Sequence, residues 1–366
     1  MLKEFDKKIV LEDGSEYYGY AFGAKDKERV TEIVFNTSMV GYQEIVSDPT
    51  YINQTVVMTY TLIGNYGITD EDFESKTLTI GGLVVREYNN FPSNFRYTKT
   101  LAELMEENDI PGIYGLDTRK LARSIRDNGS CKAYICAAST PLDKALEILK
   151  STEFSKDEVA KVSCKKRWYS RTPNPKYNVV AIDCGIKLSI VRTLNAIGCN
   201  VTVIPWDTPA SEVEMMKPDG IFISDGPGDP ADAVAVIELI KELKGKYPIF
   251  GEGLGHQMIS LAYGAKISKL KFGHRGCNHP IKDLETGLVS IETQNHSFVV
   301  DKDSLSATDL EATHINLLDD TVEGVKCQKD MVWGVQYYPG TEKGPKGSDN
   351  FFDKFIKVMK EGKANA

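Results

Sequence analysis

The feature that most constrains the fold is a change in the hydrophobic pattern near residue 177, after which short apolar runs alternate with helix-like stretches. The run at 178–183 is almost entirely apolar, which is typical of a strand covered on both faces. Strands of this kind that alternate with helices are joined by crossover connections. The second half is therefore predicted to be an α/β domain with a mainly parallel open sheet. Its other predicted elements are strands at 200–205, 220–224 and 247–251 and helices at 189–197 and 231–244.

The first part of the chain has a different pattern, in which turn residues separate short strand-like runs. Helices are predicted at 101–108 and 120–127, the second of them after Asp117, a residue type that caps helices. We expect a mixed α/β domain over 1–150, a linker over 151–176 that contains two prolines, and the α/β domain over 177–362. The strands predicted in the first domain lie at 8–11, 17–22, 32–35, 55–59 and 79–85.

Charge and hydropathy exclude several classes of partner. The 366 residues include 52 acidic and 44 basic side chains, a net charge of −8, which argues against nucleic acid or an anionic membrane as the main partner. No apolar run approaches the roughly 18 residues of a membrane span, and the N-terminal residues do not resemble a secretory signal. The seven cysteines are scattered singly, as expected of reduced thiols. We expect a cytoplasmic protein.

The most informative local motif is Gly-Glu-Gly-Leu-Gly-His-Gln at 251–257, which leads from a predicted strand directly into a helix. Such a turn is typical of a nucleophile elbow, whose apex residue is exposed above the sheet. Here the apex is Gly253, and a glycine has no side chain that could act as a nucleophile. On these residues alone, a plain tight turn is the favoured interpretation, because three glycines in five residues more often form a tight turn than a site.

A set of further motifs, in order along nearly the whole chain, resembles one known family. The elbow at 251–257 and the segments 224–230 and 294–298 resemble the signatures of class I glutamine amidotransferases. The first half resembles the N-terminal domain of the carbamoyl-phosphate synthetase small subunit. The segments that carry this second resemblance are 35–44, 47–51, 63–67, 93–96 and 115–123.

The resemblance implies a Cys-His-Glu triad that this chain lacks. The family has a cysteine at the elbow apex and a His-Pro-Glu motif near the C-terminus; this chain has Gly253, Tyr338 and Gly340 at these positions. All three catalytic side chains are missing, so we expect no glutaminase activity.

Three other residues could in principle replace the lost nucleophile or base. His256 follows the elbow, and we interpret it as structural. Cys184 ends the first strand of the second domain, where a lone cysteine is more often a small buried hydrophobic residue. Ser260 lies about two turns along the helix, too deep to reach a substrate above the sheet.

The positions of the family's glutamine pocket are better preserved. They offer backbone N–H and amide groups suited to an α-amino acid, so glutamine or another small amino acid is a candidate ligand. We expect no metal and no cofactor in this chain; the resemblance places ATP and Mg on a large-subunit partner. The pocket positions are Thr50, Gly226, Gly228, Leu254, Gln257, Asn295, Ser297 and Phe298, of which Ser297 stands where the family usually has glycine.

Three functional hypotheses follow. The first is a non-catalytic subunit of a large synthetase that makes carbamoyl phosphate from bicarbonate, ATP and free ammonia, for pyrimidine or arginine biosynthesis. The second is an active glutaminase subunit that uses an unrecognised nucleophile. The third is a repurposed amino-acid-binding or scaffolding protein. The preserved motifs of the first half favour the first hypothesis, because in the family that domain makes much of the contact with the large subunit.

Overall fold

The computed structural model describes residues 4–340 and 351–364, and the chain divides into two compact units. Unit 1 consists of Met1–Ser155 together with a distant segment, Lys271–Arg275. Unit 2 consists of Lys156–Leu270 and Gly276–Ala366. The sequence pattern gave no sign that a five-residue segment would return to the first unit.

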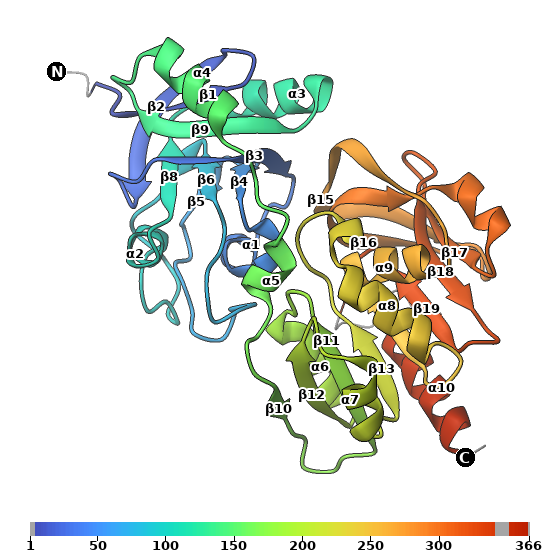
Figure 1. The fold of residues 1–366 in the computed structure, drawn as a ribbon. Coiled ribbons are helices and arrows are strands. Elements are labelled where there is room, and N and C mark those ends of the chain that lie inside the picture. Colours follow the sequence, from blue (N-terminus) through green and yellow to red (C-terminus); the bar gives the residue numbers. More distant parts are fainter. Residues whose placement is uncertain (1–3, 341–350, 365–366) are drawn as a thin grey trace. The chain divides into compact units, whose positions relative to one another are not determined.

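Unit 1 is built around a closed barrel of seven strands (Figure 1). The strands follow the order β1-β2-β8-β6-β4-β3-β9, and β9 pairs with β1 to close the barrel. The pairs β3–β4, β4–β6 and β6–β8 are parallel, whereas the other pairs are antiparallel. The elements are β1 (Lys7–Leu11), β2 (Glu16–Gly23), β3 (Arg29–Asn36), α1 (Tyr42–Ser47), β4 (Gln54–Met58), β5 (Leu62–Ile63), β6 (Gly82–Val85), β7 (Glu87–Tyr88), α2 (Leu101–Glu107), β8 (Pro111–Tyr114), α3 (Thr118–Asn128), β9 (Cys131–Ala137) and α4 (Leu142–Ser151).

Side chains that alternate along the barrel strands form its core. One apolar cluster takes a residue from every barrel strand and therefore fills the interior; Leu121 and Ile125 of α3 belong to the same cluster. A second cluster joins the strands to α1 and α2, and a third joins them to α4. The helix α3 begins two residues before the predicted start, directly after Asp117, whose side chain accepts a hydrogen bond from the backbone N–H of Lys120 and caps the helix as predicted.

Unit 2 contains one sheet of ten strands, in the order β10-β12-β11-β13-β14-β19-β18-β16-β15-β17. The five strands β12, β11, β13, β14 and β19 are parallel to one another. At the two ends of this group, β10 pairs with β12 and β18 pairs with β19, both antiparallel. The elements are α5 (Glu158–Val162), β10 (Trp168–Ser170), β11 (Tyr177–Asp183), α6 (Leu188–Ala196), β12 (Cys199–Pro205), α7 (Ala210–Met215), β13 (Gly220–Ile223), α8 (Val234–Leu243), β14 (Ile249–Glu252), α9 (Leu254–Ala262), β15 (Ile267–Asp283), β16 (Val289–Val300), β17 (Glu311–Asn316), β18 (Val322–Cys327), β19 (Val332–Val335) and α10 (Phe351–Ala364).

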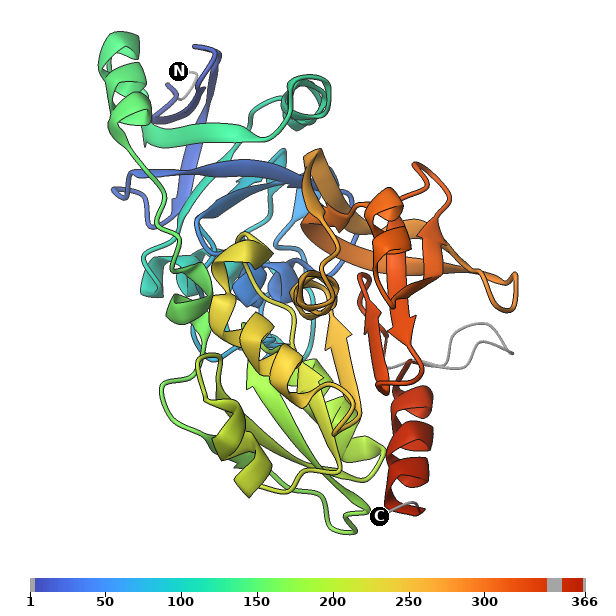
Figure 2. The same cartoon turned by 45° about the vertical axis from the view of Figure 1, so that its right-hand side comes forward.

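Helices cover both faces of the parallel strands, as the continuous apolar runs require. In β11, Val180 and Ile182 pack with α7, α8 and α9, whereas Val179 and Ala181 pack with α6 and α10. The two views in Figures 1 and 2 show α8 and α9 side by side on one face of the sheet. The predicted α/β class and parallel sheet are confirmed; the long antiparallel strands β15 and β16 were not predicted.

The stretch 151–176, expected to be a linker, contains regular structure. It includes α5 and β10, and β10 pairs with β12 at the edge of the sheet. The strand β10 could not be predicted, because three residues are too few to show an alternation of apolar and polar side chains and the surrounding segment is basic and rich in proline. Among the described residues, no helix combines the length and the apolar character needed to cross a membrane.

Candidate functional site

The predicted elbow lies at the junction of β14 and α9. Gly253 has φ 54° and ψ −113°, a conformation that residues with a side chain rarely adopt. Its N–H donates to the carbonyl of Val335 at 2.9 Å, and its carbonyl accepts from the N–H of Gln257 at 3.2 Å. The apex is therefore fixed between the end of β19 and the first turn of the helix, at the carboxyl edge of the parallel strands. This edge is where ligands bind in open α/β sheets.

The carboxylate of Asp225 occupies the space beside the apex. Its Oδ1 accepts a hydrogen bond from the backbone N–H of Leu254 at 2.8 Å, which satisfies one of the free donors at the start of α9. A Cβ atom built on Gly253 would lie 2.9 Å from Oδ2 of Asp225, and closer still to Cγ and Oδ1. A side chain at the apex would therefore require the Asp225 carboxylate to move, in addition to the strain of the backbone conformation.

A buried ion pair lies beside Tyr338, the residue at the position of the family's catalytic histidine. Lys187, just before α6, pairs with Glu252 at the end of β14, with Nζ and Oε1 3.6 Å apart and both side chains at most 7% exposed. The ammonium group of Lys187 also lies over the ring of Tyr338. Tyr338 is fixed in turn by its backbone N–H, which donates to Thr293 at 2.9 Å. Lys187, Glu252 and Tyr338 thus come together at the ends of β11, β14 and β19.

The roles of Lys187, Glu252 and Asp225 were not predicted from the sequence. One signal was present: Glu252 is a charged residue between an apolar strand and the elbow apex, where its side chain is fully buried. A buried carboxylate requires a partner. The partner could not be identified from the sequence, because Lys187 is far away along the chain and the two meet only through the order of the strands.

The three residues considered as replacement catalysts are all buried. Burial, followed by the charges of Asp183 and Asp225, raises the pKa of the Cys184 thiol well above its ordinary value. Burial lowers the pKa of His256 to about 3, against the opposing effect of a backbone hydrogen bond to Gly334. The hydroxyl of Ser260 donates to the His256 carbonyl at 3.0 Å, one turn back along α9.

The predicted glutamine-pocket residue Gln257 is engaged within the protein. Its Nε2 donates to the carbonyl of Phe298 at 2.7 Å and to Oε1 of Gln336 at 2.8 Å, so both amide hydrogens are used. These bonds bring the elbow helix and the β16 segment of Asn295 and Ser297 together. Within that segment Asn295 is buried, whereas Ser297 and Phe298 are half-buried.

Most of the remaining predicted positions lie in loops, whereas Thr50 lies in the short 3-10 helix Pro49–Tyr51. Gly226 and Gly228 follow β13; a Cβ at Gly226 would collide with the backbone of Cys184, which explains why glycine is required there. Thr50 belongs to unit 1, where its hydroxyl donates to Oδ1 of Asp48 at 2.7 Å. Gly340 is exposed and follows the β19 strand by five residues.

Comparison with known proteins gives the same assignment for both halves. Residues 9–135 match the family model for the carbamoyl-phosphate synthase small chain, CPSase domain, and residues 180–358 match class I glutamine amidotransferase. The carbamoyl phosphate synthase small chain of Staphylococcus saprophyticus is 48% identical over 99% of this chain and 98% of the relative. The small chain of Fusobacterium nucleatum is 49% identical over 96% of this chain and 98% of the relative. The small chain of Listeria monocytogenes is 46% identical over 98% of this chain and 99% of the relative. This chain belongs to the carbamoyl-phosphate synthase small-chain family.

Proposed function

We propose that this chain is a small subunit without glutaminase activity, which binds a carbamoyl-phosphate synthase large chain and serves ammonia-dependent synthesis. The observation that carries the proposal is the state of the elbow: its apex is Gly253, and the carboxylate of Asp225 fills the space a nucleophile would need. In a comparable hydrolase, removal of the nucleophile or the base lowers kcat by about 10⁶-fold. Among the described residues, no buried group beside the elbow makes up this loss.

The position of the missing base supports the same conclusion. Tyr338 replaces the histidine, and its ring covers the ammonium group of the Lys187–Glu252 pair. A hydrolytic site needs a group that can accept a proton from the nucleophile and return it to the leaving ammonia. Here a buried ion pair and an aromatic ring occupy that place. We infer that this region now stabilises the fold of unit 2.

The alternative of an active glutaminase needs a nucleophile, and the raised pKa of Cys184 leaves that thiol protonated at neutral pH. The alternative of an amino-acid-binding protein needs free donors, whereas both amide hydrogens of Gln257 are already used. A role as a subunit needs only a folded unit 1 with a surface for the partner. The small chains that are 46–49% identical support it, since a small chain by its name belongs with a large one.

The test is to co-express the chain with the large chain from the same genome and to purify the complex through a tag on the large chain. We expect both chains in the eluate and carbamoyl phosphate formed from ammonium but not from glutamine. The Gly253→Cys variant should also release no ammonia from glutamine, because the base is still missing. Failure of the chains to co-purify, or efficient use of glutamine by the wild-type complex, would defeat the proposal.

A further inference from the structure

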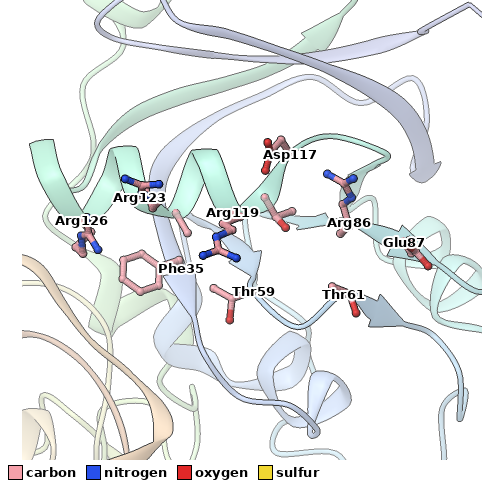
Figure 3. Close-up of a pocket in the computed structure, with 11 residues that line it drawn as sticks. Phe35, Thr59, Thr61, Arg86, Glu87, Asp117, Arg119, Arg123 and Arg126 are labelled. Atoms are coloured by element: carbon pink, nitrogen blue, oxygen red, sulfur yellow. The ribbon is translucent and has the colours of Figure 1, made fainter.

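A pocket of about 620 Å³ lies in unit 1, remote in sequence from the elbow and its degenerate triad (Figure 3). Four arginines and three threonines contribute to its lining: Arg86, Arg119, Arg123, Arg126, Thr59, Thr61 and Thr118. The volume is within the range of roughly 300–1,000 Å³ that is typical of small-molecule sites. An arginine cluster is notable in a chain whose net charge is −8.

The pocket is placed at one edge of the barrel by the direction of its strands. The strands β3, β4, β6 and β8 are parallel, and the lining residues come from the end of β3 or directly follow β4, β6 and β8. The pocket therefore lies at the carboxyl ends of four parallel strands, the edge at which α/β folds commonly bind ligands. The hydroxyl-bearing Thr59 and Thr61 follow β4 at this edge.

The arginines are held toward the pocket by the amphipathic character of α3. Leu121 and Ile125 of this helix are buried in the cluster that fills the barrel. Arg119, Arg123 and Arg126 follow each other at spacings of four and three residues, so they share the opposite face. Figure 3 shows Arg119 and Arg126 reaching down from this helix, with Arg119 directed toward Thr59.

Most of these guanidinium groups have no carboxylate partner. Arg126 pairs with its neighbour Asp127, with Nη2 and Oδ1 2.7 Å apart. For Arg86, Arg119 and Arg123, no ion pair or side-chain hydrogen bond exists within the described residues. The lining also contains two acidic residues, of which Asp117 is engaged as the cap of α3 and Glu87 is exposed. Like charges gathered in this way repel each other unless an anion lies between them.

We propose that this pocket binds a small oligophosphate. Along α3, the eight residues from Arg119 to Arg126 span about 10 Å, longer than a single phosphate and comparable to a chain of phosphate groups. Guanidinium forks bind phosphate oxygens in pairs, and threonine hydroxyls can donate to the same oxygens. An acidic protein segment would require an apolar centre around these charges, and the only aromatic ring in the lining is that of Phe35. This site is independent of the function proposed above.

The probe is inorganic tripolyphosphate, titrated into the full chain by calorimetry at low ionic strength, without magnesium. We expect one binding site per chain and an affinity that falls as salt is added. ATP carries the same triphosphate and should bind within about threefold of tripolyphosphate, because only the phosphates are recognised. No binding of tripolyphosphate, or binding of ATP alone, would overturn the proposal.

The variant Arg119→Ala/Arg123→Ala removes two of the unpaired charges from exposed positions. It should bind tripolyphosphate at least about tenfold more weakly, with an unchanged melting temperature. The variant Arg119→Lys/Arg123→Lys keeps the charge but loses the fork, and should bind with intermediate affinity. The matched control is Arg167→Ala/Arg192→Ala, which removes two exposed arginines from unit 2 and should bind like the wild type.

Two results would refute the site. An equal loss of affinity in the control variant would show that net charge, and not this pocket, attracts the anion. The second result has two parts: the wild-type chain does not bind tripolyphosphate, and the variant Arg119→Ala/Arg123→Ala no longer co-purifies with a large chain. In that case the arginines form a docking surface for an acidic partner, and the proposal is wrong.

Discussion

Replacement of Gly253 by cysteine is the most direct test of how the elbow is built. The substitution restores the family's nucleophile at the apex but leaves the backbone at φ 54° and ψ −113°. The new Cβ collides with the carboxylate of Asp225, so that this side chain must move. Movement breaks the hydrogen bond of 2.8 Å from the backbone N–H of Leu254 to Oδ1.

The magnitude follows from two contributions. A side chain held in such a backbone conformation costs on the order of 1–3 kcal/mol. Loss of a hydrogen bond to a charged group costs roughly 1.5–3 kcal/mol. Together they should lower the free energy of unfolding of unit 2 by about 2.5–6 kcal/mol, with a fall in melting temperature on the order of 10 °C.

The assay is thermal and urea unfolding followed by tryptophan fluorescence. All three tryptophans, Trp168, Trp206 and Trp333, belong to unit 2, so the signal reports this unit. The control is Gly264→Cys beyond the other end of α9, where φ is +90° and no atom lies within 4 Å of the new Cβ. It should lose only about 1 kcal/mol.

A double-mutant cycle separates collision from backbone strain. Addition of Asp225→Ala to Gly253→Cys removes the obstructing carboxylate, so the two substitutions together should cost less than the sum of their separate effects. The reasoning is refuted if Gly253→Cys and Gly264→Cys lower stability equally, or if the double variant shows no recovery.

Three further predictions concern unit 2. Burial lowers the pKa of His256 to about 3 and that of His314 to about 4, below the unfolded value of about 6.5, so stability is complete above pH 6.5 and falls as the pH drops. Each histidine should lower the free energy of unfolding by about 2 kcal/mol between pH 6.5 and pH 5. The variant His314→Asn should therefore reduce the pH dependence of the urea midpoint, and an unchanged pH dependence would contradict this. Iodoacetamide should label the exposed Cys277 at once and Cys184 only after unfolding, as peptide mass spectrometry can check. Lys187→Met removes the ammonium group that pairs with the buried Glu252 carboxylate, and should lower the free energy of urea unfolding by about 3 kcal/mol; a loss below about 1 kcal/mol would show that the pair contributes little.

The sequence predicted the parallel strands of unit 2 because they are covered on both faces and read as continuous apolar runs. The run at 178–183 lies within β11, and the last three residues of the run at 247–251 lie within β14. The barrel strands β8 and β9 were not predicted. Each is short or carries cysteine, lysine and glycine, so its alternation is weak, and its pairing depends on strands far away in sequence.

The candidate site was predictable only where a motif carried it. The elbow and its apex at Gly253 follow from glycines in sequence, whereas the contact with Asp225 depends on how two loops meet. The same holds for Lys187 and Glu252, which are joined by strand order alone. The arginines of α3 share a face that the sequence shows, but the pocket in front of them depends on closure of the barrel.

The return of Lys271–Arg275 to unit 1 has a consequence for the order of synthesis. Within this unit, the carbonyl of Lys271 accepts from Ser130 at 2.9 Å and that of Arg275 from Thr37 at 3.2 Å, and Phe272 stacks on Phe35. These contacts cannot form until the ribosome has made most of the second unit. The first unit therefore emerges early but is completed late, and a nascent chain that stalls before residue 271 leaves the ring of Phe35 without its cover.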